Sequence, residues 1–478
     1  MLFNSYVYIF LFLPVVLAVY FLLNNRNLIF TGKVWLVLAS LFFYSYWNPI
    51  YLPLILASML VNYFIGGALS KDDYQARHWL VSRKSILVSG IVFNLSLLGY
   101  YKYADFFITN ANFIFGADIH LLRLVLPLAI SFFTFQQIAY LVDNYKDRSS
   151  KYDFINFALF VSFFPQLISG PIVHHKEMMP QFGTTENKSI NYKNMSTGIF
   201  IFFLGLFKKV VIADTLAVAA SNGFDNAAVL TFAQAWVSSL SYTCQLYFDF
   251  SGYTDMAIGT AFMFNIVLPL NFNSPYKALN IQDFWRRWHM TLSRWLRDYL
   301  YISLGGNRKG NIRTYINLFT TFLLGGLWHG AGWTFVVWGA MHGFGTTIHK
   351  FWQSYGIRLP KSVAWFITFM FVHFAWVFFR ATSFKDAVKV FKGMFAFNTI
   401  NSASILYELK ALNFEKTIET VFSITVLIIA LIVSIRFKNS NELRLNLNFR
   451  YLMCVAFLIV SGFIFLNSNI SEFLYFNF

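Results

Sequence analysis

The sequence has few charged residues for its length. Only 12% of its 478 residues are Asp, Glu, Lys or Arg, whereas 57% are hydrophobic. Soluble domains carry about 25% charged residues, so one aqueous globule could not bury this much apolar surface. We therefore expect an all-α polytopic membrane protein, because helices satisfy their own backbone polar groups within the bilayer.

Acidic residues are scarcer than basic ones. The chain has 21 Asp and Glu against 37 Lys and Arg, which gives a formal net charge of +16. A basic balance often indicates nucleic-acid binding. In a chain this apolar, it is better explained by cytoplasmic loops enriched in Lys and Arg. We expect the lipid bilayer, and no nucleic acid, as a partner.

Cysteine is nearly absent, and so are the histidine spacings of metal sites. Cys244 and Cys454 lie in apolar runs and exclude a disulfide framework. HExxH, the zinc-binding pattern of metalloproteases, does not occur. We expect neither a metal nor a permanently bound cofactor. The apolar N-terminus lacks the basic region of a signal peptide and is interpreted as a first membrane span.

Long hydrophobic runs are what the sequence has in abundance. A span needs about 20 mostly apolar residues. Candidate spans lie at about 6–23, 31–47, 50–69, 85–101, 121–142, 154–172, 195–213, 230–268, 313–328, 332–352, 362–380, 417–436 and 450–468. The run 230–268 suits either two passes or a broken helix, and the short runs near 313–352 suit re-entrant segments. We expect about eleven to thirteen helices in a single membrane-embedded domain, residues 1–478.

The longest polar stretch is 271–313, which has eight basic and two acidic residues and is expected to be a cytoplasmic interfacial segment. Within it, 284–299 predicts a helix with tryptophans on one face and arginines on the other. The candidate anion-binding residues are Arg286, Arg287, Arg294, Arg297, Arg308 and Lys309. Such a helix suits an anchor to anionic lipid. It also suits a docking face for an anionic cofactor, because Arg matches phosphate geometry.

One histidine, His329, lies in the apolar stretch LLGGLWHGAGW. A helix entering the membrane near Arg313 would carry it about 24 Å inward. Ionisable residues at such depth are costly and often functional. Burial favours the neutral imidazole, which can accept a proton as a general base. A neutral structural histidine bonded between helices is the alternative. No GxSxG nucleophile motif accompanies it, which favours direct transfer to an external hydroxyl.

Other ionisable residues give weaker signals. Asp249 and Asp255, in YFDFSGYTD, are predicted to lie within the membrane, where they would line a path for an acceptor or bond neighbouring helices. His342 and His349 are seven residues apart and share a helix face. We expect them to form hydrogen bonds between helices.

Two stretches together resemble a known family. FWRRWHMTLSRWLRDYLYISLGGNRKG and LLGGLWHGAGWTFVVWGAMHG are similar to the membrane-bound O-acyltransferase superfamily, and most similar to its bacterial branch that acetylates alginate and peptidoglycan. YFDFSGYTDMAIG supports the same resemblance, which extends along nearly the whole chain. The resemblance implies helices around a central tunnel, with His329 as the buried histidine and His289 as its companion.

The resemblance also implies a reaction. Acetyl would come from cytoplasmic acetyl-CoA and pass through the bacterial inner membrane to an extracytoplasmic polysaccharide, with help from a periplasmic SGNH-like partner protein. His329 would act as the base and His289 would bind or orient near it. The D-alanylating branch of the superfamily uses a carrier-protein thioester instead. A glycan or lipid transporter or flippase is the alternative function, and a membrane scaffold for the secreted partner is a third.

Overall fold

The computed structural model describes residues 1–70, 82–147, 153–400, 414–443, 449–466 and 473–474. All regular secondary structure in these residues is helical. Five of the described helices are long and apolar enough to cross a membrane: Tyr8–Asn25, Pro49–Ser70, Arg83–Phe115, Lys361–Arg380 and Ile418–Arg436. The expected all-α polytopic membrane protein is confirmed.

The described residues form two compact units. The first comprises Met1–Phe202 and Thr254–Leu270, and the second comprises Phe203–Tyr253 and Asn271–Phe478. Two of the three boundaries fall inside helices, α10 (Tyr192–Phe207) and α12 (Phe232–Met263), and the third, between Leu270 and Asn271, lies outside regular secondary structure. Within the long apolar run 230–268, Phe232–Met263 form one continuous 32-residue helix, so the run is neither two passes nor a broken helix.

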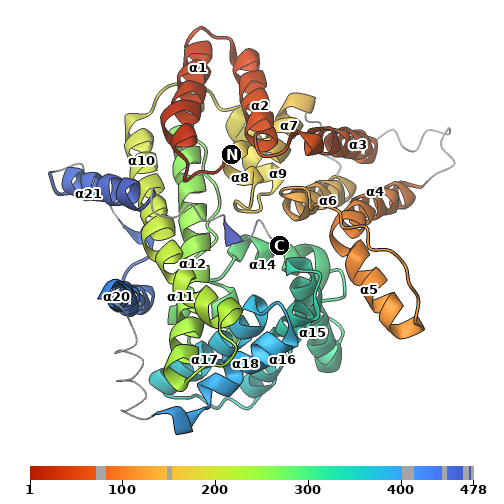
Figure 1. Ribbon diagram of the computed structural model, residues 1–478. Helices are drawn as coiled ribbons and strands as arrows, with labels where there is room; N and C mark the ends of the chain where they lie inside the picture. Colours follow the sequence, from red (N-terminus) through yellow and green to blue (C-terminus); the bar gives the residue numbers. More distant parts are fainter. Residues whose placement is uncertain (71–81, 148–152, 401–413, 444–448, 467–472, 475–478) are drawn as a thin grey trace. The chain divides into compact units, whose positions relative to one another are not determined.

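The first unit contains the N-terminal helices (Figure 1). Their bounds are η1 Tyr8–Phe12, α1 Leu13–Asn25, α2 Ile29–Ser45, η2 Pro49–Tyr51, α3 Leu52–Ser70, α4 Arg83–Leu98, η4 Gly99–Tyr103, α5 Ala104–Phe115, α6 Ile130–Asp147, α7 Phe154–Ser162, α8 Phe164–Leu167, α9 His175–Met178, η5 Met179–Phe182 and η6 Thr185–Lys188. Side-chain caps help to set these bounds, because Ser82 and Asp153 each accept a hydrogen bond from a first-turn amide of the helix that follows.

Buried polar side chains join α3, α4 and α6. The amides of Asn62 and Asn94 bond reciprocally, at 2.6 and 3.2 Å. Ser58 donates to Gln137 at 3.3 Å. Polar side chains that bond between helices hold a membrane bundle together where the hydrophobic effect cannot.

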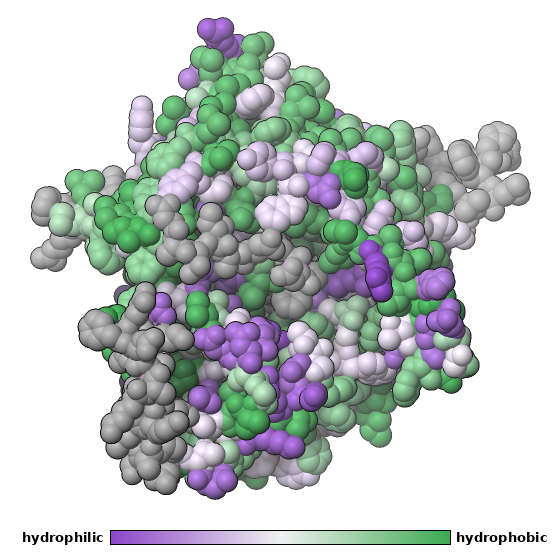
Figure 2. Space-filling model, viewed as in Figure 1, coloured by the Kyte–Doolittle hydropathy of each residue, from purple (hydrophilic) through white to green (hydrophobic). Residues whose placement is uncertain are grey.

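Much of the surface is apolar. In the first unit, Phe10, Phe30 and Phe64 expose 62%, 66% and 70% of their area. Figure 2 shows hydrophobic residues over much of the visible face, with the hydrophilic ones gathered into smaller patches. Exposed apolar surface on this scale is expected where helices contact lipid.

The second unit contains the histidines of the predicted site. Its helices are η7 Lys208–Ala213, α11 Asp214–Ser221, η8 Asn222–Asn226, η9 Pro275–Lys277, α13 Ile281–Trp285, α14 Met290–Trp295, η10 Leu296–Tyr301, α15 Gly310–His329, α16 Trp333–Ser354, α17 Lys361–Arg380, α18 Phe384–Met394, η11 Phe397–Thr399, α20 Phe414–Arg436, η12 Ser440–Glu442 and α21 Phe449–Leu466. α15 and α16 are full helices of 20 and 22 residues.

Glycines allow α15 and α16 to pack closely side by side (Figure 1). A methyl group on Gly326 would lie 2.4 Å from the Phe335 carbonyl oxygen and 2.7 Å from the Gly339 Cα. Both neighbours are backbone atoms that cannot rotate away. Because His329 ends α15 three residues later, this contact fixes the position of the imidazole relative to α16.

Substituting Gly326 by alanine is therefore expected to destabilise the protein by about 1–3 kcal/mol, as overpacking does. Gly332→Ala is the matched control, because its added methyl group would meet only the Phe335 ring, at an ordinary 3.6 Å. Thermal unfolding in detergent compares the two variants. Equal stability of both would contradict the close contact.

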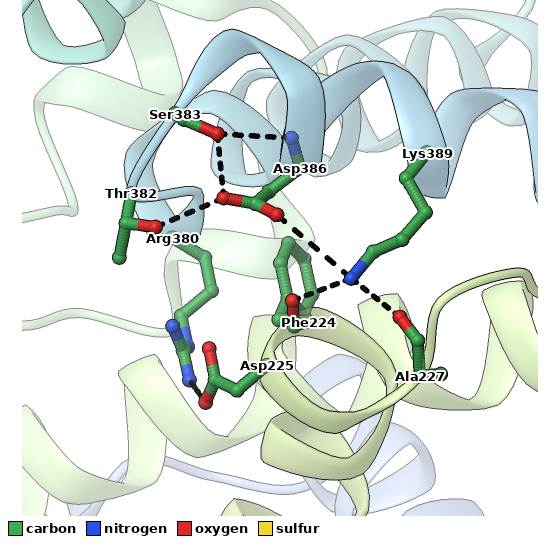
Figure 3. A network of polar contacts seen from close by, with 8 residues as sticks. All are labelled: Phe224, Asp225, Ala227, Arg380, Thr382, Ser383, Asp386 and Lys389. Carbon is green, nitrogen blue, oxygen red and sulfur yellow. Dashed lines mark hydrogen bonds and ion pairs between the residues drawn. The ribbon is translucent and has the colours of Figure 1, made fainter.

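A polar network fastens the end of α17 to η8 (Figure 3). Arg380 pairs with Asp225, and its guanidinium lies over the Phe224 ring at 5.4 Å. Lys389 of α18 donates to the carbonyls of Phe224 and Ala227, both at 2.8 Å. The network holds the turn of α17 that carries Phe379, a residue of the site described next.

Candidate functional site

His329 is the last residue of α15 and is almost completely buried, at 2% exposure. Three aromatic rings surround its imidazole: Trp328 at 5.0 Å, Trp338 at 5.0 Å and Phe379 at 5.2 Å between centroids. These rings come from α15, α16 and α17. The helix ends here because Gly330 is extended, with φ −159°, and leads directly to α16.

His289 lies beside His329, with 6.5 Å between the two ring centroids. It is fully buried, and its ring meets Phe250 of α12 edge-on at 4.8 Å. The structure therefore brings together the two histidines that the sequence motifs predict as a pair, although they are 40 residues apart.

The predicted continuous helix over 284–299 is wrong. α13 ends at Trp285 and α14 begins at Met290, because His289 adopts the left-handed conformation with φ +41°. A non-glycine residue with positive φ is uncommon and often marks a functional constraint. The break turns the His289 side chain into the core, where a regular helix would have left it at the edge of the apolar face.

Asn271 holds this break and was not predicted. Its side-chain oxygen accepts hydrogen bonds from the Thr291 hydroxyl at 2.6 Å and the Thr291 amide at 3.3 Å, and His289 Nδ1 lies 3.3 Å from it. A carbonyl oxygen can only accept, which favours the His289 tautomer protonated at Nδ1. Burial lowers the pKa of His289 to about 3, so the ring is neutral at physiological pH.

This pKa predicts a pH dependence of stability. The folded protein keeps His289 neutral down to about pH 3, whereas the unfolded chain takes up a proton below about pH 6.5. The contribution of His289 to the free energy of unfolding is therefore fully present above pH 6.5 and is lost as the pH is lowered. Between pH 6.5 and 4.5 the loss is about 2–3 kcal/mol.

His289→Asn removes the ionisable ring while tolerating the left-handed backbone. Its free energy of unfolding should fall less between pH 7.5 and 4.5 than that of the unsubstituted protein. Denaturant titrations in detergent at the two pH values make the comparison. An identical loss in both proteins would contradict the assignment.

His342 connects α13 to the aromatic residues around His329. Its Nδ1 accepts a hydrogen bond from the Trp285 indole at 3.2 Å, as expected of an interhelical role. The His342 ring also meets Trp338 at 4.7 Å, and Trp338 in turn contacts His329. Trp338 was not predicted to belong to the site, since a tryptophan in an apolar run is usually a packing residue.

Some of the candidate anion-binding residues already form ion pairs with carboxylates, and others do not. Arg287 pairs with Asp283 at 2.8 Å, and Arg297 pairs with Asp298 at 2.7 Å. Arg286 is exposed and forms no ion pair in the described part of the chain. Arg308 and Lys309 are also exposed, in the turn before α15 that Gly305 and Gly306 shape with positive φ. The half-buried Arg294 lies on α14.

The two predicted acceptor-path carboxylates lie on different faces of α12, because six residues turn a helix by about 240°. Asp249 is 2.9 Å from Lys209, which also contacts Asp214 at 2.7 Å. Its second oxygen accepts from the Leu474 amide at 3.0 Å. Asp255 is 3% exposed and belongs to the part of α12 in the first unit. Asp249 is thus part of a buried ion cluster, which the sequence did not predict.

Comparison with known proteins places these residues in a family. The model of the MBOAT, or membrane-bound O-acyltransferase, family matches residues 141–385, which include both histidines. The chain is 48% identical to the peptidoglycan O-acetyltransferase of Helicobacter pylori, over all of this chain and 98% of the relative. It is 42% identical to the probable alginate O-acetylase of Pseudomonas aeruginosa, over 84% of this chain and 76% of the relative.

A more distant relative is the teichoic acid D-alanyltransferase of Bacillus subtilis, 32% identical over 47% of this chain and 61% of the relative. The family match therefore spans half of the chain, and two acetylating relatives align with most of it. On this evidence, the chain belongs to the membrane-bound O-acyltransferase family.

Proposed function

We propose that this acyltransferase takes acetyl from cytoplasmic acetyl-CoA and passes it across the bacterial inner membrane for O-acetylation of an extracytoplasmic polysaccharide. The observation that carries the proposal is the pairing of His329 with His289 inside an aromatic shell. The names of the two acetylating relatives support the acetyl group and the polysaccharide.

His329 is the general base of the proposed reaction. It accepts the proton of the acceptor hydroxyl while the hydroxyl oxygen attacks the thioester carbonyl. The carbon–sulfur bond then breaks, and the leaving thiolate takes the proton from His329. The products are the acetyl ester and the free thiol of CoA. The surrounding rings exclude water, which would otherwise hydrolyse the thioester.

His289 is the companion of the base. Its Nδ1 is held by the contact with Asn271, and its ring is neutral at physiological pH. His289 can therefore orient groups near His329, but it carries no charge that would neutralise an anion. A neutral imidazole acts through directed hydrogen bonds. We assign it a place at the donor side of the reacting thioester.

The basic end of the second unit is proposed to face the cytoplasm and bind the donor. α15 begins beside Arg308 and Lys309 and ends at His329, so one helix joins the basic turn to the catalytic histidine. Positive charge on cytoplasmic segments follows the general rule for membrane proteins. Because Arg287 and Arg297 already have carboxylate partners, Arg286, Arg308 and Lys309 are the stronger candidates among the predicted residues.

The acceptor side is proposed from the relatives and from α12. The relatives include a peptidoglycan O-acetyltransferase and a probable alginate O-acetylase, which makes an extracytoplasmic polysaccharide such as peptidoglycan, alginate or another exopolysaccharide the best candidate acceptor. We propose that an SGNH-like periplasmic protein completes the transfer. Asp255 and Asp249 are retained as candidates for the acceptor path.

Transfer across a sealed membrane tests the proposal. Proteoliposomes would receive labelled acetyl-CoA on one side, with polysaccharide and the periplasmic partner on the other. We expect ester on the polysaccharide and free CoA on the donor side. Polysaccharide movement without thioester consumption would instead support a transporter.

A further inference from the structure

A second polar cluster lies where α13 packs against α16, away from the paired histidines. α13 and the residue after it contribute Gln282 and Arg286, and the last turns of α16 contribute His349, Lys350 and Gln353. Arg286, Lys350 and Gln353 are exposed, and His349 is half-buried. We call these five residues the Arg286 cluster.

Hydrogen bonds within the cluster engage the acceptor atoms of His349 and Gln282. The Gln353 amide nitrogen lies 3.0 Å from His349 Nε2 and 3.5 Å from the Gln282 side-chain oxygen. Because an amide nitrogen can only donate, His349 Nε2 accepts and the ring proton is placed on Nδ1. The acceptor groups of His349 and Gln282 are thus used within the cluster. Their remaining donors, Nδ1–H and the Gln282 amide, form no hydrogen bond among the described residues and can bind a ligand.

The cluster gathers positive charge that no described carboxylate neutralises. Arg286 and Lys350 both lie close enough to His349 to act on it electrostatically. The neighbouring Arg287 differs, because Asp283 holds it in an ion pair. Phosphate is bound by groups of this kind: a guanidinium, an ammonium, an imidazole N–H and an amide, none of which pairs with a carboxylate among the described residues.

We propose that the Arg286 cluster binds the phosphate of a 4′-phosphopantetheine thioester, the part shared by CoA and acyl carrier proteins. The proposal rests on the function proposed above and names where the donor is held. It adds His349, Lys350, Gln282 and Gln353 to the residues that recognise the donor, none of which was expected to do so.

Distance supports this location. Trp338, His342 and His349 follow one another along the same face of α16. The eleven residues from Trp338 to His349 span about 16 Å. About thirteen bonds separate phosphorus from sulfur in phosphopantetheine, which is about 15 Å when extended. A phosphate at His349 therefore places the thioester beside Trp338, whose ring is 5.0 Å from that of His329.

The basic turn before α15 does not fit the same phosphate. Gly310 and His329 are the first and last residues of α15, and nineteen residues span about 28 Å. An extended arm of about 15 Å would end well short of His329 from there. Arg308 and Lys309 are thus assigned to the more distant, nucleotide part of CoA.

Ligands that differ by one phosphate test the proposal. Calorimetry would measure binding of CoA, 4′-phosphopantetheine and pantetheine to the full-length protein in nanodiscs. We expect phosphopantetheine to bind more tightly than pantetheine. Arg286→Gln and Lys350→Gln should each weaken CoA and phosphopantetheine by about 10- to 100-fold, as loss of a charge-assisted hydrogen bond does. Pantetheine binding should not change.

Arg313→Gln is the matched control, because Arg313 is exposed near the start of α15 and lies outside the cluster. It should leave phosphopantetheine binding unchanged, and Arg286→Lys should recover part of the lost affinity. Unchanged phosphopantetheine affinity in Arg286→Gln would overturn the proposal. So would a variant that loses only its response to phosphatidylglycerol in the nanodisc, since the cluster would then bind lipid headgroups.

Acetyl-CoA and an acetylated carrier protein are then supplied in turn to the same variants. This comparison shows which of the two donors provides the phosphopantetheine thioester. Failure of the proposed function is a different result. In that case the unsubstituted protein would bind phosphopantetheine through the Arg286 cluster yet consume no acetyl thioester.

Discussion

Replacing His329 by alanine is expected to lower kcat for acetyl transfer by about a thousandfold, within the range that a general base contributes. The KM for acetyl-CoA should stay within about threefold, because the Arg286 cluster and the basic turn remain. The assay is release of free CoA by purified protein in nanodiscs with an acceptor present.

Two variants accompany this measurement. His329→Gln keeps a polar side chain of similar size but cannot act as a base, and should be as inactive as the alanine variant. His120→Ala changes an exposed histidine of the first unit and should retain full activity. A normal kcat in His329→Ala would show that His329 is only a packing residue and that another group acts as the base.

Replacing Lys209 by methionine is expected to destabilise the protein by about 3–5 kcal/mol, as removing one partner of a buried ion pair does. Lys209 is buried between Asp214 at 2.7 Å and Asp249 at 2.9 Å. Without it, the two carboxylates would lose the ammonium group that contacts both of them. The yield of folded protein and its unfolding temperature report the loss.

Asp214→Asn is the matched variant for the ion cluster. It removes one of the two carboxylates and leaves Lys209 paired with Asp249, so its cost should be clearly smaller than that of Lys209→Met. If Lys209→Met folded as well as Asp214→Asn, the pairing in this cluster would not contribute to stability.

The helices could be predicted largely because hydrophobic runs determine membrane helices. Runs such as 31–47, 50–69 and 362–380 correspond closely to α2, α3 and α17. The run 121–142 fits less well, since α6 begins only at Ile130. Apolar composition cannot reveal where a chain stays irregular when other parts of the protein satisfy its backbone groups.

The site could be predicted only in part. His329 was predicted because an ionisable residue in an apolar stretch is conspicuous, and His289 was predicted from the family resemblance; the structure places the two rings beside each other. The left-handed backbone at His289 was not found, since it depends on Asn271, which is distant enough in sequence to escape a helical pattern. Periodicity treats 284–299 as one helix unless such a partner is known.

Pairing among charged residues also escapes a sequence pattern. Six basic residues were predicted to hold an anion, yet two of them are occupied by Asp283 and Asp298. Conversely, His349 and Lys350 join Arg286 only because α13 and α16 pack together. Charge density along the chain predicts which surface is basic, and contacts between helices decide which of its residues are available.

One measurement tests the central claim most directly. A structure of the protein with a stable ketone analogue of acetyl-CoA, in which methylene replaces the thioester sulfur, would locate the reacting carbonyl. We predict the carbonyl carbon beside the His329 imidazole and the pantetheine phosphate at Arg286 and His349. A carbonyl remote from His329, in a complex competent for turnover with the natural thioester, would contradict the account.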